Sequence, residues 1–197
     1  PMGDDPAPFF ANLFLLYFEW QYMKKLNREN NTLACKFNYT FRYIDDLITI
    51  NSLNNFDRSI EKIYPAEIQL KKESLSIYEA TFLDLHIKIE DSKFFTRLYD
   101  KRDNFNFSIV RMPHKDSLMP KKMFESSINA EILRICKATT EYNHFVESVR
   151  TLMKRMKNQG ADTEGIAMKL CKIFQHHEIF FLKFGCNYNR IIKDILY

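Results

Sequence analysis

Glycine, paired cysteines and long apolar runs are scarce in this sequence. Only 4 of its 197 residues are glycine, so a glycine-rich loop that wraps a phosphate group has almost no material. The four cysteines are far apart and form no Cys-x-x-Cys pair, which favours reduced thiols inside a cell. No apolar run approaches the roughly 20 residues that a membrane helix needs. We therefore expect an intracellular location, the nucleus included, and no membrane partner.

Hydrophobic and basic residues are plentiful by contrast. Hydrophobic residues make up 46% of the chain and aromatic residues 15%, which allows a sizeable core and argues against disorder. The net charge is +4, which permits a nucleic-acid partner without demanding one. Eight basic residues gather between positions 120 and 158: Lys121, Lys122, Arg134, Lys137, Arg150, Lys154, Arg155 and Lys157. They are either a solvated helical face or a surface that binds nucleic acid.

Local patterns divide the chain near residue 115. Before it, helical spacing at 9–26 and 56–63 alternates with runs that favour strands at 37–42, 47–50, 67–70, 82–89 and 94–99, the last two separated by a turn at 90–92. After Pro120, the pattern predicts helices at 121–139, 142–156 and 163–175. The expected fold class is α+β, with an antiparallel sheet and helices in residues 1–115 and an all-helical region in residues 116–197.

Two adjacent carboxylates carry the strongest chemical signal. Asp45 and Asp46 follow Tyr43-Ile44 between two short runs that favour strands, so we expect an antiparallel hairpin with both acids at its tip. Like charges this close raise each other's pKa, and a hard divalent cation relieves the repulsion. Two such ions about 3.5–4 Å apart catalyse phosphoryl transfer. Asp-Asp is also common in plain exposed turns, and these four residues alone do not decide between the two.

Four sequence blocks in this order strengthen the catalytic interpretation of that motif. They are residues 1–14, 43–46, 82–86 and 97–101, and the first contains Met-Gly, Ala-Pro and Ala-Asn-Leu-Phe elements. In order and spacing they resemble reverse transcriptases, most closely those of Penelope-like and related non-viral retroelements. The agreement continues through 112–114, 117–120 and 134–136 and covers residues 1 to 160. The resemblance implies the distal palm of a right-hand polymerase, followed by its thumb.

The resemblance also assigns roles to residues. Asp45 and Asp46 would bind the catalytic Mg²⁺ or Mn²⁺, with Asp45 the more essential. Pro1 and Gly3 would belong to the loop that follows template and incoming nucleotide, where glycine allows close approach of the backbone. Lys71 or Lys72 would protonate the leaving pyrophosphate, and the choice between them is open.

Two further regions would hold nucleic acid. Phe82, Leu83 and Asp84 would begin the hairpin that grips the primer end. The helices after Pro120 would lay basic side chains, among them Lys154, Arg155 and Lys157, on the backbone of the duplex. The implied partners are an RNA template, a DNA primer and deoxynucleoside triphosphates.

The resemblance has departures. Asp4 and Asp5 put two acids beside a nucleic-acid channel, and Met2 stands where glutamine is common in the family. The family's first metal-binding aspartate and its fingers lie upstream of Pro1, so we expect this chain to be a fragment that does not polymerise by itself. The alternative is an inactive or domesticated retroelement remnant that binds nucleic acid or protein. An RNA-copying RNA polymerase is disfavoured, because Ile44 stands where such enzymes usually have glycine.

Three weaker patterns favour plain structural roles. The Cys171, His176, His177 and Cys186 set has no common zinc spacing. Asp84 and His86 share one face of a strand-like run, which is an ordinary arrangement. The aromatic residues near the basic stretch, Phe124, Tyr142 and Phe145, could stack nucleic-acid bases, but packing between helices is the favoured interpretation.

Overall fold

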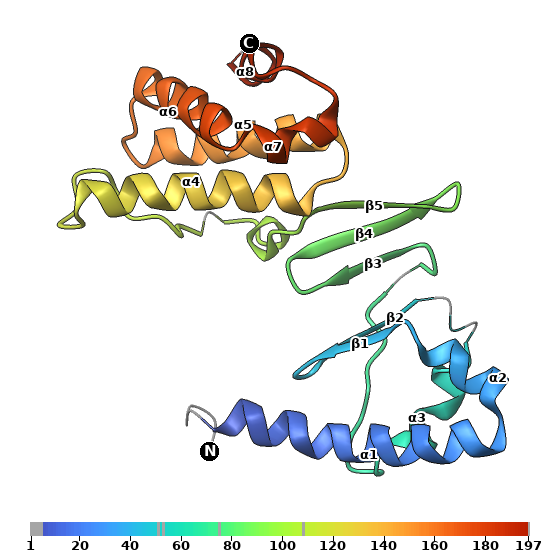
Figure 1. The fold of residues 1–197 in the computed structure, drawn as a ribbon. Helices are drawn as coiled ribbons and strands as arrows, with labels where there is room; N and C mark the ends of the chain where they lie inside the picture. The colour runs from blue at the N-terminus through green and yellow to red at the C-terminus, as the bar shows by residue number, and fades with distance from the viewer. Residues whose placement is uncertain (1–5, 51, 53, 75, 108, 197) are drawn as a thin grey trace. The chain divides into compact units, whose positions relative to one another are not determined.

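The protein folds into two compact units, Pro1–Glu73 and Ser74–Tyr197. The structure, a computed structural model, describes residues 6–50, 52, 54–74, 76–107 and 109–196 (Figure 1). Both units combine helices with a small antiparallel sheet, so the expected α+β class is confirmed. In the part of the chain that the structure describes, no helix is both long and apolar enough to cross a membrane.

The first unit is built on one long helix, α1 (Ala7–Glu29), which starts directly after Pro6. Proline suits a helix start because its missing N–H would have no partner there. The side chain of Asn30 accepts a hydrogen bond from the Leu33 amide and so begins the short helix α2. The remaining elements are α2 (Asn31–Ala34), a 3-10 turn (Cys35–Phe37), β1 (Thr40–Tyr43), β2 (Asp46–Thr49), a 3-10 turn (Asp57–Ser59) and α3 (Ile60–Ile63).

A small core holds these elements together. Its buried residues are Leu26, Ala34, Phe37, Phe56, Ile63 and Tyr64. Burial of Phe37 explains why residues 37–39 do not join the strand predicted for 37–42: Phe37 turns into the core within a 3-10 turn, and β1 starts at Thr40. The strand predicted at 67–70 is also wrong, since these residues form no strand.

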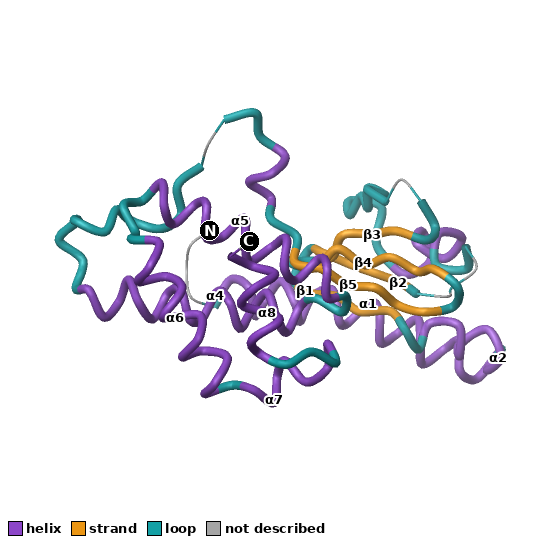
Figure 2. Tube along the Cα trace, turned by 90° about the horizontal axis from the view of Figure 1, so that it is seen from above, coloured by secondary structure: helices purple, strands orange, loops and turns teal. Residues whose placement is uncertain are grey.

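The second unit joins a three-stranded sheet to a helical bundle. Strands β3 (Glu79–Phe82), β4 (Leu85–Glu90) and β5 (Lys93–Leu98) lie side by side and antiparallel (Figures 1 and 2). A short 3-10 helix (Lys101–Asn104) follows the sheet. The bundle consists of α4 (Lys121–Ala138), α5 (Tyr142–Asn158), α6 (Thr163–His176), α7 (Glu178–Phe181), a 3-10 turn (Leu182–Phe184) and α8 (Tyr188–Leu196).

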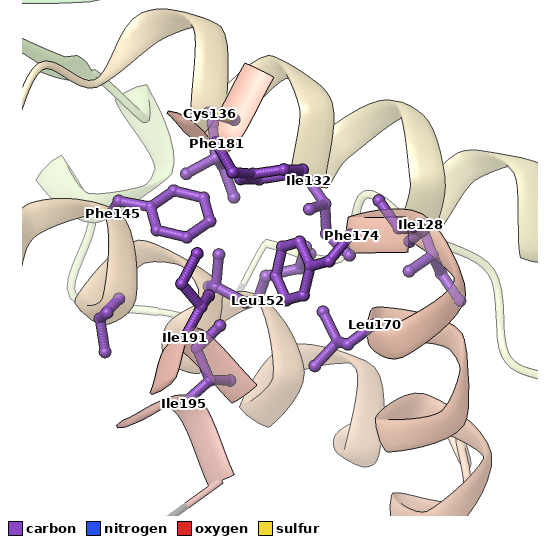
Figure 3. Close-up of a cluster of buried hydrophobic side chains, with 14 of the residues drawn as sticks. Ile128, Ile132, Cys136, Phe145, Leu152, Leu170, Phe174, Phe181, Ile191 and Ile195 are labelled. Carbon is purple, nitrogen blue, oxygen red and sulfur yellow. The ribbon is translucent and has the colours of Figure 1, made fainter. Parts of the chain in front are cut away.

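The three helices predicted after Pro120 are confirmed, and their apolar faces form the larger core of the molecule (Figure 3). Phe145 is fully buried there; its ring lies 4.9 Å from that of Phe184. Phe174 and Phe181 meet edge to face, with ring centroids 4.5 Å apart. Phe124 and Tyr142 pack against the same core. The aromatic residues of the basic stretch therefore serve helix packing, as the sequence favoured.

The boundary between the compact units differs from the one that composition indicated near residue 115. Hydrogen bonds join the sheet to the bundle: the amide of Thr96 donates to the hydroxyl oxygen of Thr140, and the amide of Thr140 donates to the carbonyl of Thr96, both at 2.9 Å. The sheet of residues 79–98 therefore belongs to the same compact unit as the helices.

Candidate active-site hairpin

The Tyr-Ile-Asp-Asp motif forms the hairpin that its flanking runs predict. Strands β1 and β2 are antiparallel, and Tyr43 pairs with Asp46, so only Ile44 and Asp45 make the loop. Ile44 has a φ of +55°. A positive φ at the first loop position alone is the pattern of a type II′ turn, whose twist matches that of the strands. The motif therefore places Asp45 in the turn and Asp46 at the start of β2.

The conformation of Ile44 is costly. A β-branched side chain at positive φ is a genuine outlier, and strain of this kind costs about 1–3 kcal/mol unless the surroundings enforce it. Such strain gathers at functional sites more often than elsewhere.

Arg42 anchors the hairpin to α1. Its guanidinium donates hydrogen bonds to the carboxylate of Glu19 at 2.6 Å and to the side-chain oxygen of Asn12 at 2.7 Å. It also donates to the carbonyl of Ile44 at 3.1 Å, inside the strained turn. The Arg42 side chain is only 12% exposed, so water competes little for these bonds.

Tyr64 completes the anchor. Its hydroxyl donates to the Glu19 carboxylate at 2.6 Å. Burial of the ring and the negative charge of Glu19 both raise the pKa of Tyr64 well above its ordinary value. Glu19 therefore accepts from two buried donors, Arg42 and Tyr64, and fixes the base of the hairpin against α1.

The two carboxylates of the motif are free of such partners. Asp45 and Asp46 are both exposed, and neither carboxylate forms a hydrogen bond or ion pair with another described residue. Carboxylate oxygens are the ligands that Mg²⁺ and Mn²⁺ prefer, so the chemistry of this pair fits such an ion. However, the described part of the chain contains no group of three or more His, Cys, Asp or Glu residues that could hold a metal. The pair could therefore form only part of a two-metal site.

The two candidate lysines have different surroundings. Lys72 lies 3.0 Å from the carboxylate of Asp57 in an exposed ion pair. Lys71 is exposed and forms no ion pair within the described ranges. An exposed ion pair contributes little free energy, so neither lysine is fixed in place, and Lys71 is the less restrained of the two.

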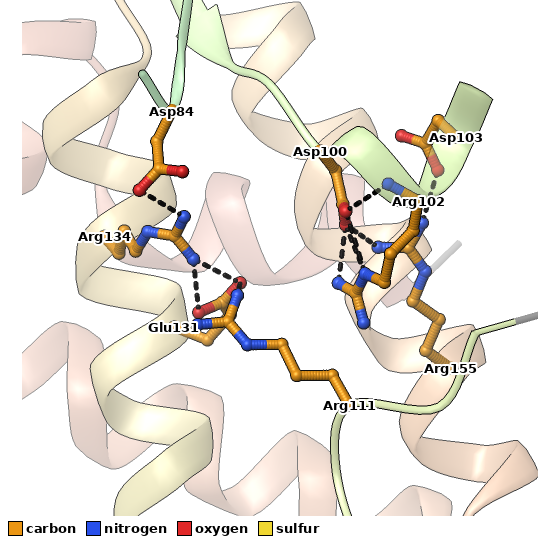
Figure 4. A network of polar contacts seen from close by, with 8 residues as sticks. All are labelled: Asp84, Asp100, Arg102, Asp103, Arg111, Glu131, Arg134 and Arg155. Carbon is orange, nitrogen blue, oxygen red and sulfur yellow. Dashed lines mark hydrogen bonds and ion pairs between the residues drawn. The ribbon is translucent and has the colours of Figure 1, made fainter. Parts of the chain in front are cut away.

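A second hairpin repeats the geometry of the first. Phe82 pairs with Leu85, so Leu83 and Asp84 form the two-residue loop, and Leu83 has a φ of +55°. This turn interrupts the single strand predicted for 82–89. Here the carboxylate has a partner: Asp84 forms an ion pair with Arg134 of α4 at 2.8 Å, as Figure 4 shows.

The basic residues of α5 also divide into two kinds. Lys154 and Lys157 are exposed and form no ion pair with any other described residue. Arg155 binds Asp100 and Asp103, each at 2.6 Å (Figure 4). Hydrogen bonds from Arg102 above all, with Arg155 adding to them, hold the pKa of Asp100 below its usual range although burial opposes this. The three predicted contacts are therefore two free lysines and one engaged arginine.

Two of the candidate residues, Pro1 and Gly3, lie outside the described residues. The anchor of Arg42, Glu19 and Asn12 is the part of the site that sequence reasoning missed. Asn12 belongs to the Ala-Asn-Leu-Phe element, which was a signal for it. Arg42 at a polar position of a short strand gave no such sign, because its partners lie 23 and 30 residues away.

Comparison with known proteins assigns no family to these features. No family model matches the chain, and no curated protein or solved structure is significantly similar to it.

Proposed function

We propose that this chain is the distal palm and thumb of an RNA-directed DNA polymerase, a reverse transcriptase of a retroelement. The observation that carries the proposal is the β1–β2 hairpin. It presents Asp45 and Asp46 to solvent on a strained turn that a largely buried arginine, Arg42, fixes to α1. Strain together with free carboxylates is more typical of a working site than of a plain turn.

In this proposal Asp45 and Asp46 hold Mg²⁺ or Mn²⁺. Metal ions in such a site activate an attacking oxygen and stabilise a leaving one. Arg42 acts indirectly, because its hydrogen bond to the Ile44 carbonyl keeps the turn in the conformation that presents both acids. Rigid placement matters because positioning and charge stabilisation account for nearly all of phosphoryl-transfer catalysis.

Other residues bind and move protons. Lys71 or Lys72 donates a proton to the departing pyrophosphate, as a general acid does. Residues 82–85 contact the primer end through the second hairpin. Lys154 and Lys157, exposed on α5, contact phosphates of the template–primer duplex.

The proposal assigns the remaining carboxylate and the fingers to sequence upstream of Pro1, as the resemblance implies. The test is extension of a DNA primer on an RNA template with Mg²⁺, by the 197-residue chain and by the protein encoded by the complete reading frame. We expect extension only by the longer protein. Robust extension by this chain alone would overturn the assignment of the missing carboxylate, and an inactive longer protein would overturn the polymerase itself.

A second candidate is a non-catalytic module that binds nucleic acid. It is favoured by the exposed Lys154 and Lys157 of α5, which need no metal ion to bind phosphates. The two candidate functions differ in whether Asp45 binds a metal ion. A polymerase site requires Asp45 to bind Mn²⁺, and paramagnetic broadening of nearby resonances detects this binding in the longer protein. A binding module shows no such specific broadening and holds the duplex equally well after Asp45→Asn.

A further inference from the structure

A pocket of about 330 Å³ opens in the second unit, beside the polar network of Figure 4. This volume is within the range of small-ligand sites. The pocket lies between the segment that follows β5 and the helices α4 and α5, so it makes no use of Asp45 or Asp46, which belong to the other compact unit. Its lining includes aromatic, basic and amide side chains.

Two aromatic rings form one wall. Phe105 and Phe107 remain 51% and 61% exposed, although the same unit buries Phe145, Phe174 and Phe181 almost completely. The two rings are 5.3 Å apart between centroids and inclined at 52°. Two large apolar rings that line a pocket and stay exposed are typical of a binding surface, and flat rings offer the faces on which nucleic-acid bases stack.

Three arginines line the same pocket, and only one is lightly engaged. Arg102 is paired with Asp100 at 2.5 Å, and Arg155 with two aspartates. Arg111 is 56% exposed and lies 3.8 Å from Glu131, at the edge of ion-pair distance. Glu131 in turn accepts two hydrogen bonds from Arg134, each at 3.2 Å. Glu131 therefore orients Arg111 while leaving most of its five donors for another anion.

Amide groups complete the lining. Asn158 and Gln159, at the end of α5, contribute to the pocket wall. The carbonyl of Gln159 accepts a hydrogen bond from the amide of Lys115 at 2.9 Å, which holds this end of α5 in place. Side-chain amides offer both donors and acceptors, which is what the edge of an unpaired base requires.

We propose that this pocket binds an unpaired nucleotide of a single-stranded nucleic acid. The base stacks on Phe105 or Phe107, and its phosphate is held by Arg111. A base within a duplex cannot use the site, because its faces are already covered by its neighbours. The ligand is a strand rather than a free nucleotide, since two adjacent exposed rings offer faces to successive bases.

The test uses the complete chain and fluorescence anisotropy with end-labelled dT10 and rU10 strands. Phe105→Ala and Phe107→Ala should each weaken binding about tenfold, the usual effect of losing one stacking ring. Arg111→Gln should weaken binding and lower the log–log salt slope by about 0.7, since one phosphate contact is lost. The matched controls are Phe94→Ala and Arg97→Gln. Both residues are exposed on β5 and lie outside the pocket lining, and circular dichroism confirms that each variant is folded.

Two further probes make the result decisive. A ten-residue strand of abasic sugar phosphate should bind more weakly than dT10 and should not respond to Phe105→Ala, because it has nothing to stack. Free UMP should displace dT10 only at a large molar excess. The proposal is overturned if the pocket variants behave like the β5 controls, or if the abasic strand binds as tightly as dT10. Displacement by UMP at equal nucleotide concentration would overturn the assignment to a strand.

Discussion

Two hairpins of this molecule share one turn and use it differently. In both, a two-residue loop starts with a bulky apolar residue at a φ of +55°, Ile44 or Leu83, and continues with an aspartate. In the first hairpin the aspartate, Asp45, is exposed and free of any described ion-pair partner. In the second, Asp84 meets Arg134 of α4 at 2.8 Å.

The difference lies in where the arginine is. In the second hairpin it faces the carboxylate of the turn and so ties the sheet to the bundle. In the first, Arg42 lies behind the turn, on the strand, and takes its carboxylate from α1 instead. The turn is thus fixed without neutralising Asp45. An identical backbone motif can therefore be a structural joint or a presented pair of acids, depending on which side the cation approaches.

The largest expected effect is the loss of primer extension on replacing Asp45. In the longer protein, Asp45→Asn should reduce primer extension on the order of a thousandfold or more, because it removes a metal-binding charge while keeping the shape of the side chain. Steady-state primer extension with Mg²⁺ measures this. The matched control is Asp91→Asn in the exposed β4–β5 turn, which should change the rate little. Full activity of Asp45→Asn would remove Asp45 from the mechanism.

The two ion pairs that support the turns should differ in their contribution to stability. Arg42→Met leaves the Glu19 carboxylate, 25% exposed, with Tyr64 as its remaining side-chain donor, and should cost about 3 kcal/mol. Asp84→Asn weakens only the pair with Arg134, which stays bound to Glu131, and should cost about 1 kcal/mol, because Asp84 is 68% exposed.

Trp20 on α1 is the only tryptophan of the chain, so its fluorescence during urea unfolding reports on the first unit. Circular dichroism follows the helices of both units, so the transition that it shows and that Trp20 does not report belongs to the second unit. Lys25→Met, which breaks an exposed pair with Glu29, is the control and should change stability by less than about 0.5 kcal/mol. Equal losses from Arg42→Met and Asp84→Asn would contradict the distinction between a largely buried and an exposed ion pair.

Local pattern was sufficient for the helices after Pro120 and for the first hairpin, but not for the second hairpin. The helices after Pro120 repeat apolar residues at helical spacing, which needs no knowledge of the rest of the chain. The turn at Leu83 has no glycine or asparagine to mark it, so the run at 82–89 was predicted as one strand. An apolar residue at positive φ contradicts local preference, and only the contacts around it enforce that conformation.

The candidate site shows the same limit. Asp45 and Asp46 stand out because they are adjacent in sequence. Their support does not, because Arg42 and Glu19 are 23 residues apart. Arg155 was predicted to contact nucleic acid from its charge and from the resemblance, whereas its partner Asp100 lies 55 residues away and neutralises it. Charge patterns reveal which residues are basic but not which of them are already paired.

The stability of the second unit should fall at the acid end of the pH range. The pKa of Asp100 is lowered by its bonds to Arg102 and Arg155, below the value near 3.9 of an unfolded aspartate. The stability that Asp100 contributes is therefore fully present above about pH 4 and is lost as the pH falls through its folded pKa. Asp100→Asn should lower stability at pH 7 and flatten this acid limb in circular dichroism. An unchanged acid limb would show that other carboxylates govern acid unfolding.

Free and paired cations on α5 should differ in binding. Replacing Lys154 and Lys157 together by glutamine should lower the log–log salt slope of duplex binding by about 1.8, since each lost phosphate contact removes about 0.9. Arg155→Gln should change the slope less than either lysine does and should reduce stability, because it releases two aspartates. Fluorescence anisotropy with a labelled RNA–DNA duplex over a range of salt measures both. A slope that does not respond to the two lysines would mean that they are only a solvated surface.

The smallest expected effect concerns the turns themselves. Asparagine adopts positive φ more readily than a bulky apolar residue, so Leu83→Asn should stabilise the second unit by up to about 1 kcal/mol. Ile44→Asn should stabilise the first unit by less than this, because Ile44 is half-buried and its replacement loses apolar contact.

If strain at Ile44 helps to present Asp45, Ile44→Asn should reduce primer extension by the longer protein without lowering the urea midpoint that Trp20 reports. The relaxed turn keeps its anchor, since the hydrogen bond from Arg42 ends on the backbone carbonyl of residue 44. A variant that gains stability and keeps full activity would make the strained turn a feature of the fold alone, as we expect for Leu83.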